Sequence, residues 1–241
     1  MRQVELDKLL HPDYASALAN KFLSYGTTDP IVYDPINPVD ARQTCAGLSL
    51  TEIFNLFGSD KGSYGHNYGV IYERYLREMR SASITMAEIG VRCGASQKSF
   101  ASYFNSAKIY AADIDSRCAH TCSSWPNIEV KIMDARKDSV VEGQVLDIFI
   151  DDGSHISRDI LASFELNFSC LRPGGYYFIE DTHCTWSPGY LAEQSLSQRN
   201  KSDFSRSYFL CLLDLVTRLG DEGVIEFVHC YRSFVVIKKS D

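Results

Sequence analysis

Short apolar runs alternate with helical segments along the chain from residue 84 onward. Each run is continuous, which is the pattern of a strand buried on both faces of a parallel sheet. The runs predict strands near residues 84–90, 108–113, 128–133, 145–151 and 176–180. Two further runs, 224–230 and 233–238, are close enough in the chain to pair as an antiparallel hairpin. This order of elements predicts an α/β fold with a doubly wound sheet and a C-terminal antiparallel hairpin.

The first fifty residues have a different character, because prolines at positions 30, 35 and 38 interrupt regular structure there. Ser49 and Glu52 then form a capping-box pattern, which predicts a helix over residues 50–57 that ends at Gly58. We therefore expect two parts, an N-terminal helical and irregular cover over residues 1–48 and one domain over residues 49–241.

The composition is that of an ordinary globular protein with an acidic tilt. The 241 residues include 24 Lys and Arg against 31 Asp and Glu, a formal net charge of −7. Proteins that bind nucleic acid usually carry a basic surplus, so we expect no nucleic-acid partner. No apolar run approaches the roughly 18 residues of a membrane helix, and the N-terminus lacks the apolar core of a signal peptide. A cytoplasmic protein with no membrane partner is the resulting expectation.

A glycine turn follows the first predicted strand and opens a helix. Gly90 and Gly94 allow the backbone to approach a ligand closely, and Asp113 ends the second strand 23 residues after Gly90. That offset is close to the roughly 20 residues at which an acid accepts hydrogen bonds from a ribose. Asp134 ends the third strand, in position to meet an adenine amino group. These residues outline an adenosine site, and a turn with nothing bound is the alternative.

The residues around the two glycines disfavour a dinucleotide. Gly90 and Gly94 flank three other residues instead of forming Gly-x-Gly-x-x-Gly. Glu88, two residues before Gly90, is similar to the acid that opens this motif in S-adenosylmethionine-dependent methyltransferases. Arg92 departs from the Gly-x-Gly-x-Gly form that is common among them.

Two acidic pairs, Asp151-Asp152 and Glu180-Asp181, stand at the ends of the fourth and fifth predicted strands. Strand carboxyl ends meet in the crevice where open α/β sheets bind ligands, so we expect these acids to converge. Clustered carboxylates repel one another unless a cation neutralises them, and oxygen ligands favour Mg²⁺ or Ca²⁺ over zinc. The alternatives are a solvated strand end for Asp151-Asp152 and a helix-capping loop for Glu180-Asp181. Asp152 is the favoured ligand of its pair, and the sequence leaves the reverse open.

His155 follows Asp152 by three residues, at the start of a predicted crossover helix. The helix dipole and a nearby cation both disfavour a charged imidazole there. A neutral imidazole near pH 7 is suited to take a proton from a hydroxyl group.

Five motifs occur in an order that a known family shares. They are Gly58-Ser59-Asp60-Lys61-Gly62, His66-x-Tyr68-x-x-x-Tyr72-Glu73, Glu88-Ile89-Gly90-Val91, Asp151-Asp152-Gly153-Ser154-His155 and Gly174-Gly175-Tyr176-Tyr177-Phe178-Ile179-Glu180-Asp181. Through them, about residues 50–185 resemble the metal-dependent sugar O-methyltransferases of macrolide biosynthesis and their cephalosporin-hydroxylase-like relatives. The resemblance implies the Rossmann-like sheet of a class I S-adenosylmethionine-dependent methyltransferase.

The resemblance also implies roles for the residues. Mg²⁺ is expected on Asp152, Glu180 and Asp181, with His155 as the general base. S-adenosyl-L-methionine is expected against Glu88, Gly90, Arg92, Gly94, Asp113, Asp134 and Lys61, although a surface lysine on a loop is an equal alternative for Lys61. The macrolide enzymes carry a longer N-terminal domain that helps to assemble a tetramer. This chain has about 50 residues before the shared part, so the acceptor and a homo-oligomeric state stay open.

The expected activity is Mg²⁺-dependent methyl transfer from S-adenosyl-L-methionine to a hydroxyl of a small-molecule acceptor, a sugar or a glycosylated natural product. Two alternatives stay open. One is a metal-dependent hydrolase that uses the same acids, and the other is a non-catalytic protein that binds S-adenosylmethionine.

Overall fold

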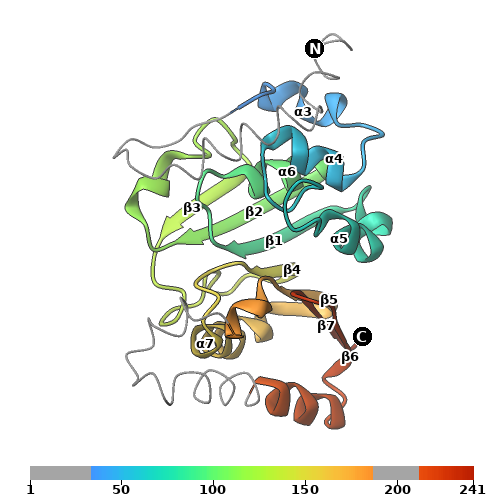
Figure 1. Cartoon of the computed structure of the whole chain (residues 1–241), viewed down its shortest axis with the longest axis vertical. Helices are drawn as coiled ribbons and strands as arrows, with labels where there is room; N and C mark the ends of the chain where they lie inside the picture. The colour runs from blue at the N-terminus through green and yellow to red at the C-terminus, as the bar shows by residue number, and fades with distance from the viewer. Residues whose placement is uncertain (1–33, 187–211) are drawn as a thin grey trace. The chain divides into compact units, whose positions relative to one another are not determined.

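The computed structural model describes residues 34–186 and 212–241 (Figure 1). Most of the predicted cover, residues 1–48, lies outside this range, so the division of the chain at residue 48 stays a prediction. No helix in the described segments has the length and hydropathy that a membrane span requires.

Seven strands form one mixed sheet in the order β3-β2-β1-β4-β5-β7-β6. The pairs β2–β3, β1–β4 and β4–β5 are parallel, whereas β7 pairs antiparallel with both β5 and β6. The predicted doubly wound sheet with a C-terminal hairpin is confirmed. The strands are β1 (Ser83–Ile89), β2 (Ser106–Asp113), β3 (Ile128–Ile132), β4 (Leu146–Asp151), β5 (Leu171–Ile179), β6 (Ile225–Cys230) and β7 (Val235–Lys239).

The fifth strand starts five residues earlier than its apolar run predicts, at Leu171. Leu171 pairs with Leu146, and the register then jumps so that Ile148 pairs with Tyr176. The intervening Pro173-Gly174-Gly175 accounts for the jump, because proline lacks the N–H that a ladder needs and Gly174 has a φ of +70°. The apolar run therefore marks only the regular part of β5.

The chain divides into two compact units, and the first runs to Ile84 and resumes over Val91–Ile132. Phe54, Tyr72 and Phe100 form its aromatic centre, with the ring of Phe100 edge-on to the other two at centroid distances of 5.3 Å. The predicted capping box of Ser49 and Glu52 is present. The helices of this unit are α3 (Pro38–Thr44), α4 (Leu50–Phe57), α5 (Gly69–Leu76) and α6 (Ala95–Tyr103), with 3-10 turns at Arg77–Met79 and Ser116–His120.

The second unit consists of Thr85–Gly90 and the chain from Met133 onward. Tyr177 of β5 lies at its centre, stacked on Phe149 at 4.8 Å and edge-on to Phe164 at 5.1 Å. Its hydroxyl shares a hydrogen bond of 2.9 Å with Ser163. The helix α7 (Ser157–Asn167), continued by a 3-10 turn at Phe168–Cys170, connects β4 to β5, and a 3-10 turn at Thr182–Trp186 follows β5. Residues 212–221 are helical and precede β6.

Candidate active site

The carboxyl ends of β1, β4 and β5 lie level with one another in the second unit. Ile89 pairs with Asp151, and Asp151 pairs with Ile179. The pairing continues past the strands, because the amide of Asp152 donates to the carbonyl of Ile89 at 3.1 Å and that of Glu180 donates to the carbonyl of Asp151 at 2.9 Å. This main-chain register brings both predicted acidic pairs to one edge.

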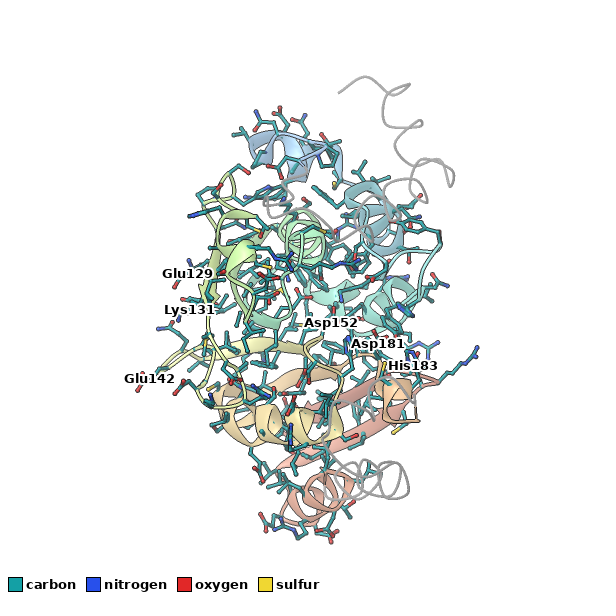
Figure 2. The ribbon with its side chains drawn as sticks, turned by 60° about the vertical axis from the view of Figure 1, so that its left-hand side comes forward. Glu129, Lys131, Glu142, Asp152, Asp181 and His183 are labelled. Carbon is teal, nitrogen blue, oxygen red and sulfur yellow. The ribbon has the colours of Figure 1, made fainter. Side chains whose placement is uncertain are left out.

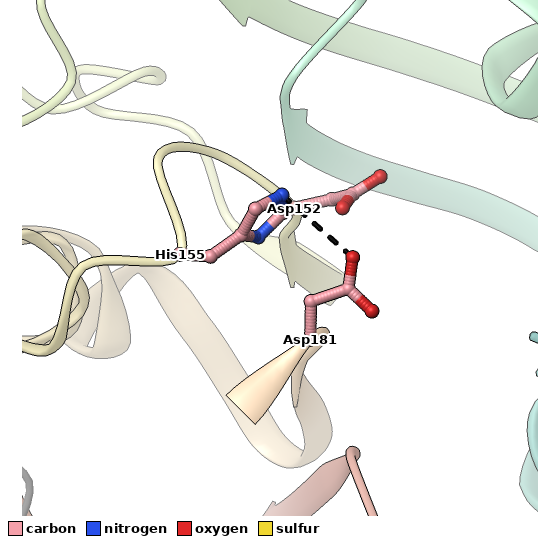
Figure 3. Close-up of side chains that lie close together, drawn as sticks. All are labelled: Asp152, His155 and Asp181. Atoms are coloured by element: carbon pink, nitrogen blue, oxygen red, sulfur yellow. Dashed lines mark ion pairs between the residues drawn. The ribbon is translucent and has the colours of Figure 1, made fainter. Parts of the chain in front are cut away.

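Asp152 belongs to two groups of side chains whose donor atoms could hold a metal ion. One group joins Asp152 to His155 and Asp181, and the other joins it to Glu88 and Glu180. Within each group the donor atoms lie within 4.8 Å of one another. The second group is the deeper one, since Glu88 is fully buried and Glu180 is 2% exposed. Figure 3 shows the first group, with Asp152 beside the pair formed by His155 and Asp181.

Glu88 was assigned by its sequence motif to the cofactor, and its nearness to Asp152 and Glu180 was not predicted. The side chain comes from inside β1, where an acid between apolar neighbours carries no sign of its partners on other strands. The parallel pairing of β1 with β4 supplies those partners.

His155 and Asp181 both depart from ordinary backbone geometry. His155 has a φ of +58° and Asp181 a φ of +51°, values that are uncommon for residues other than glycine and that cluster at functional sites. The Nε2 atom of His155 lies 3.7 Å from Oδ2 of Asp181, and Nδ1 of His183 lies 3.9 Å from Oδ1 of the same carboxylate. Figure 2 shows Asp152, Asp181 and His183 close together. Asp181 is thus placed between two imidazole rings.

Asp151, the other acid of its pair, belongs to neither group. It is 4% exposed, and its Oδ1 accepts a hydrogen bond from the amide of Gly153 at 3.3 Å. Burial raises the pKa of Asp151 to about 6. Of the two adjacent acids, Asp152 therefore faces the other candidate ligands.

Gly90 permits the close approach on which this edge depends. Its φ is +94°, and a Cβ atom added there would lie 2.2 Å from the carbonyl oxygen of Asp152. Such a separation is far below van der Waals contact, so no other residue fits without movement of the Asp152 backbone.

In the first unit, Asp113 holds the turn that follows Gly90. Its Oδ2 accepts from the amides of Val91 and Arg92 at 2.8 and 3.1 Å, and its Oδ1 accepts from the amide of Asp115 at 2.9 Å. Gly94 has a φ of +75°, and a Cβ atom there would lie 2.5 Å from Sγ of Cys122. The predicted ribose ligand is therefore also a main-chain clamp of the turn.

Arg92 and Lys61 occupy different surroundings within the first unit. Arg92 has a φ of +50° and forms a half-exposed ion pair with Asp60, at 3.3 Å between Nη1 and Oδ2. Lys61 is only 2% exposed, so the alternative of a surface lysine is wrong.

Asp134, the predicted adenine contact, lies in the second unit and already has cationic partners. Arg136 grips it with Nε to Oδ1 at 2.7 Å and Nη2 to Oδ2 at 2.8 Å, and Lys137 lies 3.2 Å from Oδ2. Hydrogen bonds from Arg136 hold the pKa of Asp134 well below its usual range. No sequence signal indicated this grip, because Arg136 and Lys137 resemble ordinary loop residues.

The donor set of the second unit fits a hard divalent cation. The two groups together contain four carboxylates, those of Glu88, Asp152, Glu180 and Asp181, and Asp152 belongs to both groups. Deprotonated carboxylates at such separations repel one another, and a divalent cation offsets that repulsion. Oxygen-rich sites of this kind suit Mg²⁺ or Ca²⁺. One imidazole among the acids leaves a group that is suited to accept a proton.

The sheet order, the glycine turn after β1 and the acidic ends of the strands define the Rossmann-like fold of a class I methyltransferase. Solved structures support this directly. The MycE methyltransferase of the mycinamycin biosynthetic pathway, in complex with Mg and SAH, superposes with a TM-score of 0.64 at 27% identity, over 80% of this chain and 55% of that chain. A further MycE complex, which also contains mycinamycin VI, gives a TM-score of 0.63 at 25% identity over 80% of this chain and 54% of that chain.

The sequence is also similar to curated O-methyltransferases. The 8-demethyl-8-alpha-L-rhamnosyl tetracenomycin-C 2'-O-methyltransferase of Streptomyces olivaceus is 31% identical over 157 residues, which is 60% of this chain and 39% of the relative. The L-olivosyl-oleandolide 3-O-methyltransferase of Streptomyces antibioticus is 35% identical over 149 residues, 56% of this chain and 37% of the relative. No protein-family model matches the sequence.

The homologues of the chain are therefore sugar O-methyltransferases of macrolide and polyketide biosynthesis, and the predicted resemblance is confirmed. The aligned part spans about two fifths of the length of these two relatives.

Proposed function

We propose that this protein transfers a methyl group from S-adenosyl-L-methionine to a hydroxyl of a sugar or glycosylated natural product, in a reaction that requires Mg²⁺. The observation that carries the proposal is the meeting of two acidic groups at Asp152, one of which includes His155, on a methyltransferase fold. The relatives, which methylate glycosides, and the complexes of MycE with Mg and SAH support the same reaction and cofactors.

In this proposal Asp152, Glu180 and Asp181 hold the metal. Bound Mg²⁺ would polarise the acceptor hydroxyl and so ease the loss of its proton. His155 takes that proton as the oxygen attacks the methyl group; the bond from the methyl carbon to the sulfonium sulfur breaks, and S-adenosylhomocysteine leaves. The carboxylate of Asp181, 3.7 Å from Nε2, stabilises the resulting imidazolium. Glu88 is assigned to the cofactor by its motif. Because Glu88 lies near Asp152 and Glu180, a cofactor bound to it would lie close to the metal.

The remaining cofactor residues are proposals with unequal support. Gly90 and Gly94 keep side chains away from the turn, and Asp113 holds the turn while its Oδ1 accepts one hydrogen bond among the described residues. A ribose hydroxyl would add a second. Arg92 and the buried Lys61 supply positive charge for the carboxylate of the cofactor.

Asp134 is proposed as the adenine contact. Its carboxylate is already gripped by Arg136, so the adenine amino group would share it with that guanidinium.

The acceptor class, the cellular location and the assembly also belong to the proposal. A small glycoside is supported by the reactions of the relatives. The acidic net charge of −7 is consistent with independence of nucleic acid, and a cytoplasmic location stays the expectation. We propose residues 1–48 as a cover of the domain over residues 49–241, and we leave the homo-oligomeric state open.

Calorimetry and methyl transfer together test the proposal. We expect S-adenosylhomocysteine to bind the full chain, and labelled methyl to pass from the cofactor to L-olivosyl-oleandolide or to the rhamnosyl tetracenomycin glycoside. Chelation by EDTA should abolish this turnover, and His155→Gln should lower kcat by about a hundredfold or more.

Each failure has its own meaning. Absence of S-adenosylhomocysteine binding would refute a methyltransferase and favour the metal-dependent hydrolase. Full turnover in EDTA would refute the metal, and unchanged turnover in His155→Gln would refute the base. Cofactor binding without transfer to either glycoside would overturn the proposed acceptor class in favour of a non-catalytic binding protein.

A further inference from the structure

His155 stands between two residues that one aspartate ties together. The hydroxyl of Ser154 donates to Oδ2 of Asp159 at 2.8 Å, and the same hydroxyl accepts from the amide of Ile156 at 3.3 Å. The amide of Asp159 in turn donates to the carbonyl of Ile156 at 2.8 Å. The backbone on both sides of His155 is therefore closed into a ring of hydrogen bonds, which we call the Asp159 clasp: Ser154, Ile156 and Asp159.

The hydrogen bonds of the clasp hold the backbone of His155 in an energetically unfavourable conformation. Its φ of +58° lies in the left-handed region, which costs an L-residue on the order of 1 kcal/mol. A residue keeps such a conformation only where its surroundings hold it there. Here the neighbours of His155 make the holding contacts, while its own ring stays near Asp181.

Asp159 is well placed to act as the anchor. It lies in the first turn of α7, and its side chain is 8% exposed. Two guanidinium groups face it, with Nε of Arg158 at 3.3 Å from Oδ1 and Nη1 of Arg136 at 3.7 Å from Oδ2. These partners orient the carboxylate so that Oδ2 points to Ser154. Arg136 is also the residue that grips Asp134, so the clasp is continuous with the proposed adenine contact.

We propose that Ser154 and Asp159 are positioning residues that hold the imidazole of His155 against Asp181 for proton transfer. The proposal rests on the role assigned to His155 under the proposed function. Neither residue belongs to the two groups of candidate metal ligands, and both act by fixing the backbone from which the imidazole projects.

Ser154→Ala in the full chain is the decisive variant, because it removes the clasp hydroxyl from an exposed side chain. Ser154→Thr keeps a hydroxyl and serves as the conservative rescue. Ser139→Ala is the matched control, since Ser139 also donates to a side-chain oxygen, at 3.0 Å on Asn167, and accepts from the amide two residues later at 3.4 Å.

The first readout is the imidazole proton resonance of His155, assigned by its loss in His155→Gln and recorded without cofactor or metal. We expect Ser154→Ala to broaden or shift this resonance, while Ser154→Thr restores it and Ser139→Ala leaves it unchanged. The other histidine resonances report whether the variant is folded. An unmoved His155 resonance in Ser154→Ala would overturn the proposal.

The second readout is the split between kcat and KM in methyl transfer. Loss of one orienting hydrogen bond should lower kcat by about tenfold in Ser154→Ala, with KM for S-adenosylmethionine within about twofold of wild type. An equal kcat in the two proteins would overturn the proposal even if the resonance moved. If wild type itself transfers no methyl group, the proposed function fails, and the resonance still decides whether the clasp orients His155.

Discussion

Replacement of Gly90 by alanine should both destabilise the fold and displace the backbone of Asp152, and a control glycine separates these two effects. The added Cβ would lie 2.2 Å from the carbonyl oxygen of Asp152, and the φ of +94° is unfavourable for any L-residue. The conformational part costs about 1–2 kcal/mol, and overpacking against backbone adds about 1–3 kcal/mol. We therefore expect Gly90→Ala to lower the free energy of unfolding by about 3 kcal/mol.

Gly143→Ala isolates the conformational part, because Gly143 has a φ of +71° and nothing within 4 Å of an added Cβ. Gly143→Ala should lower the free energy of unfolding, measured with urea, by only about 1 kcal/mol. Relief of the clash must displace the Asp152 backbone, so Gly90→Ala should also weaken Mg²⁺ binding in calorimetry, whereas Gly143→Ala should not. Equal losses of stability in the two variants, with equal Mg²⁺ affinities, would refute the reasoning.

Three further outcomes are expected. Asp34→Ala should lower the free energy of unfolding by about 3–5 kcal/mol, because it removes the carboxylate that lies 2.9 Å from the fully buried ammonium of Lys98. Asp115→Ala, at a surface pair, should cost at most about 1 kcal/mol. Burial raises the pKa of Asp34, but hydrogen bonds from its neighbours outweigh burial, so the pKa is lower in the folded protein. The contribution of Asp34 to the free energy of unfolding is therefore present above the unfolded pKa of about 4 and is lost as the pH falls. Urea midpoints should fall more steeply with decreasing pH for wild type than for Asp34→Asn, and parallel curves would contradict this. Asp152→Asn should weaken Mg²⁺ binding at least about tenfold in calorimetry, while Asp147→Asn, away from both metal groups, should leave it unchanged.

The sequence was sufficient for the parts of the fold that depend on local pattern. Short runs rich in apolar residues predicted all seven strands. Burial on both faces accounts for the run of β4, whereas β3 and β6 have only one buried residue each. Ser49 and Glu52 marked the start of α4, because a capping box satisfies main-chain amides within a single turn. The convergence of Asp152 and Glu180 was also predictable, since parallel strands end at one edge.

Features that depend on distant partners were not predictable. Lys98 and Asp34 form an ion pair in which Lys98 is fully buried, yet neither belongs to a recognisable motif, and the two residues are 64 positions apart in the chain. The grip of Arg136 on Asp134 and the burial of Lys61 likewise arise from tertiary packing. An isolated charged residue carries no local sign of its partner, so sequence alone leaves these side chains on the surface.

Strand register explains why the three acids of the deeper group, Glu88, Asp152 and Glu180, lie close together. Asp151 pairs with Ile89 and Ile179, so Asp152 and Glu180 come level with Gly90, one step beyond the strands.

Side chains alternate between the two faces of a strand, so Glu88, two residues before Gly90, falls on the same face as this level. Gly90 itself contributes no side chain there, which leaves the space that Asp152 uses. Regular strand geometry thus accounts for the deeper group of acids without any special conformation.

The group of Asp152, His155 and Asp181 does not follow from strand pairing alone. His155 and Asp181 lie beyond the ends of the strands, and both adopt positive φ values. For the residue after Glu180, an extended backbone would direct the side chain to the opposite face. A left-handed turn at Asp181 permits a different direction, and the same conformation at His155 is held by the Asp159 clasp. The acids that pairing delivers are therefore expected to tolerate small changes in the loops, whereas proton transfer through His155 is expected to depend on them.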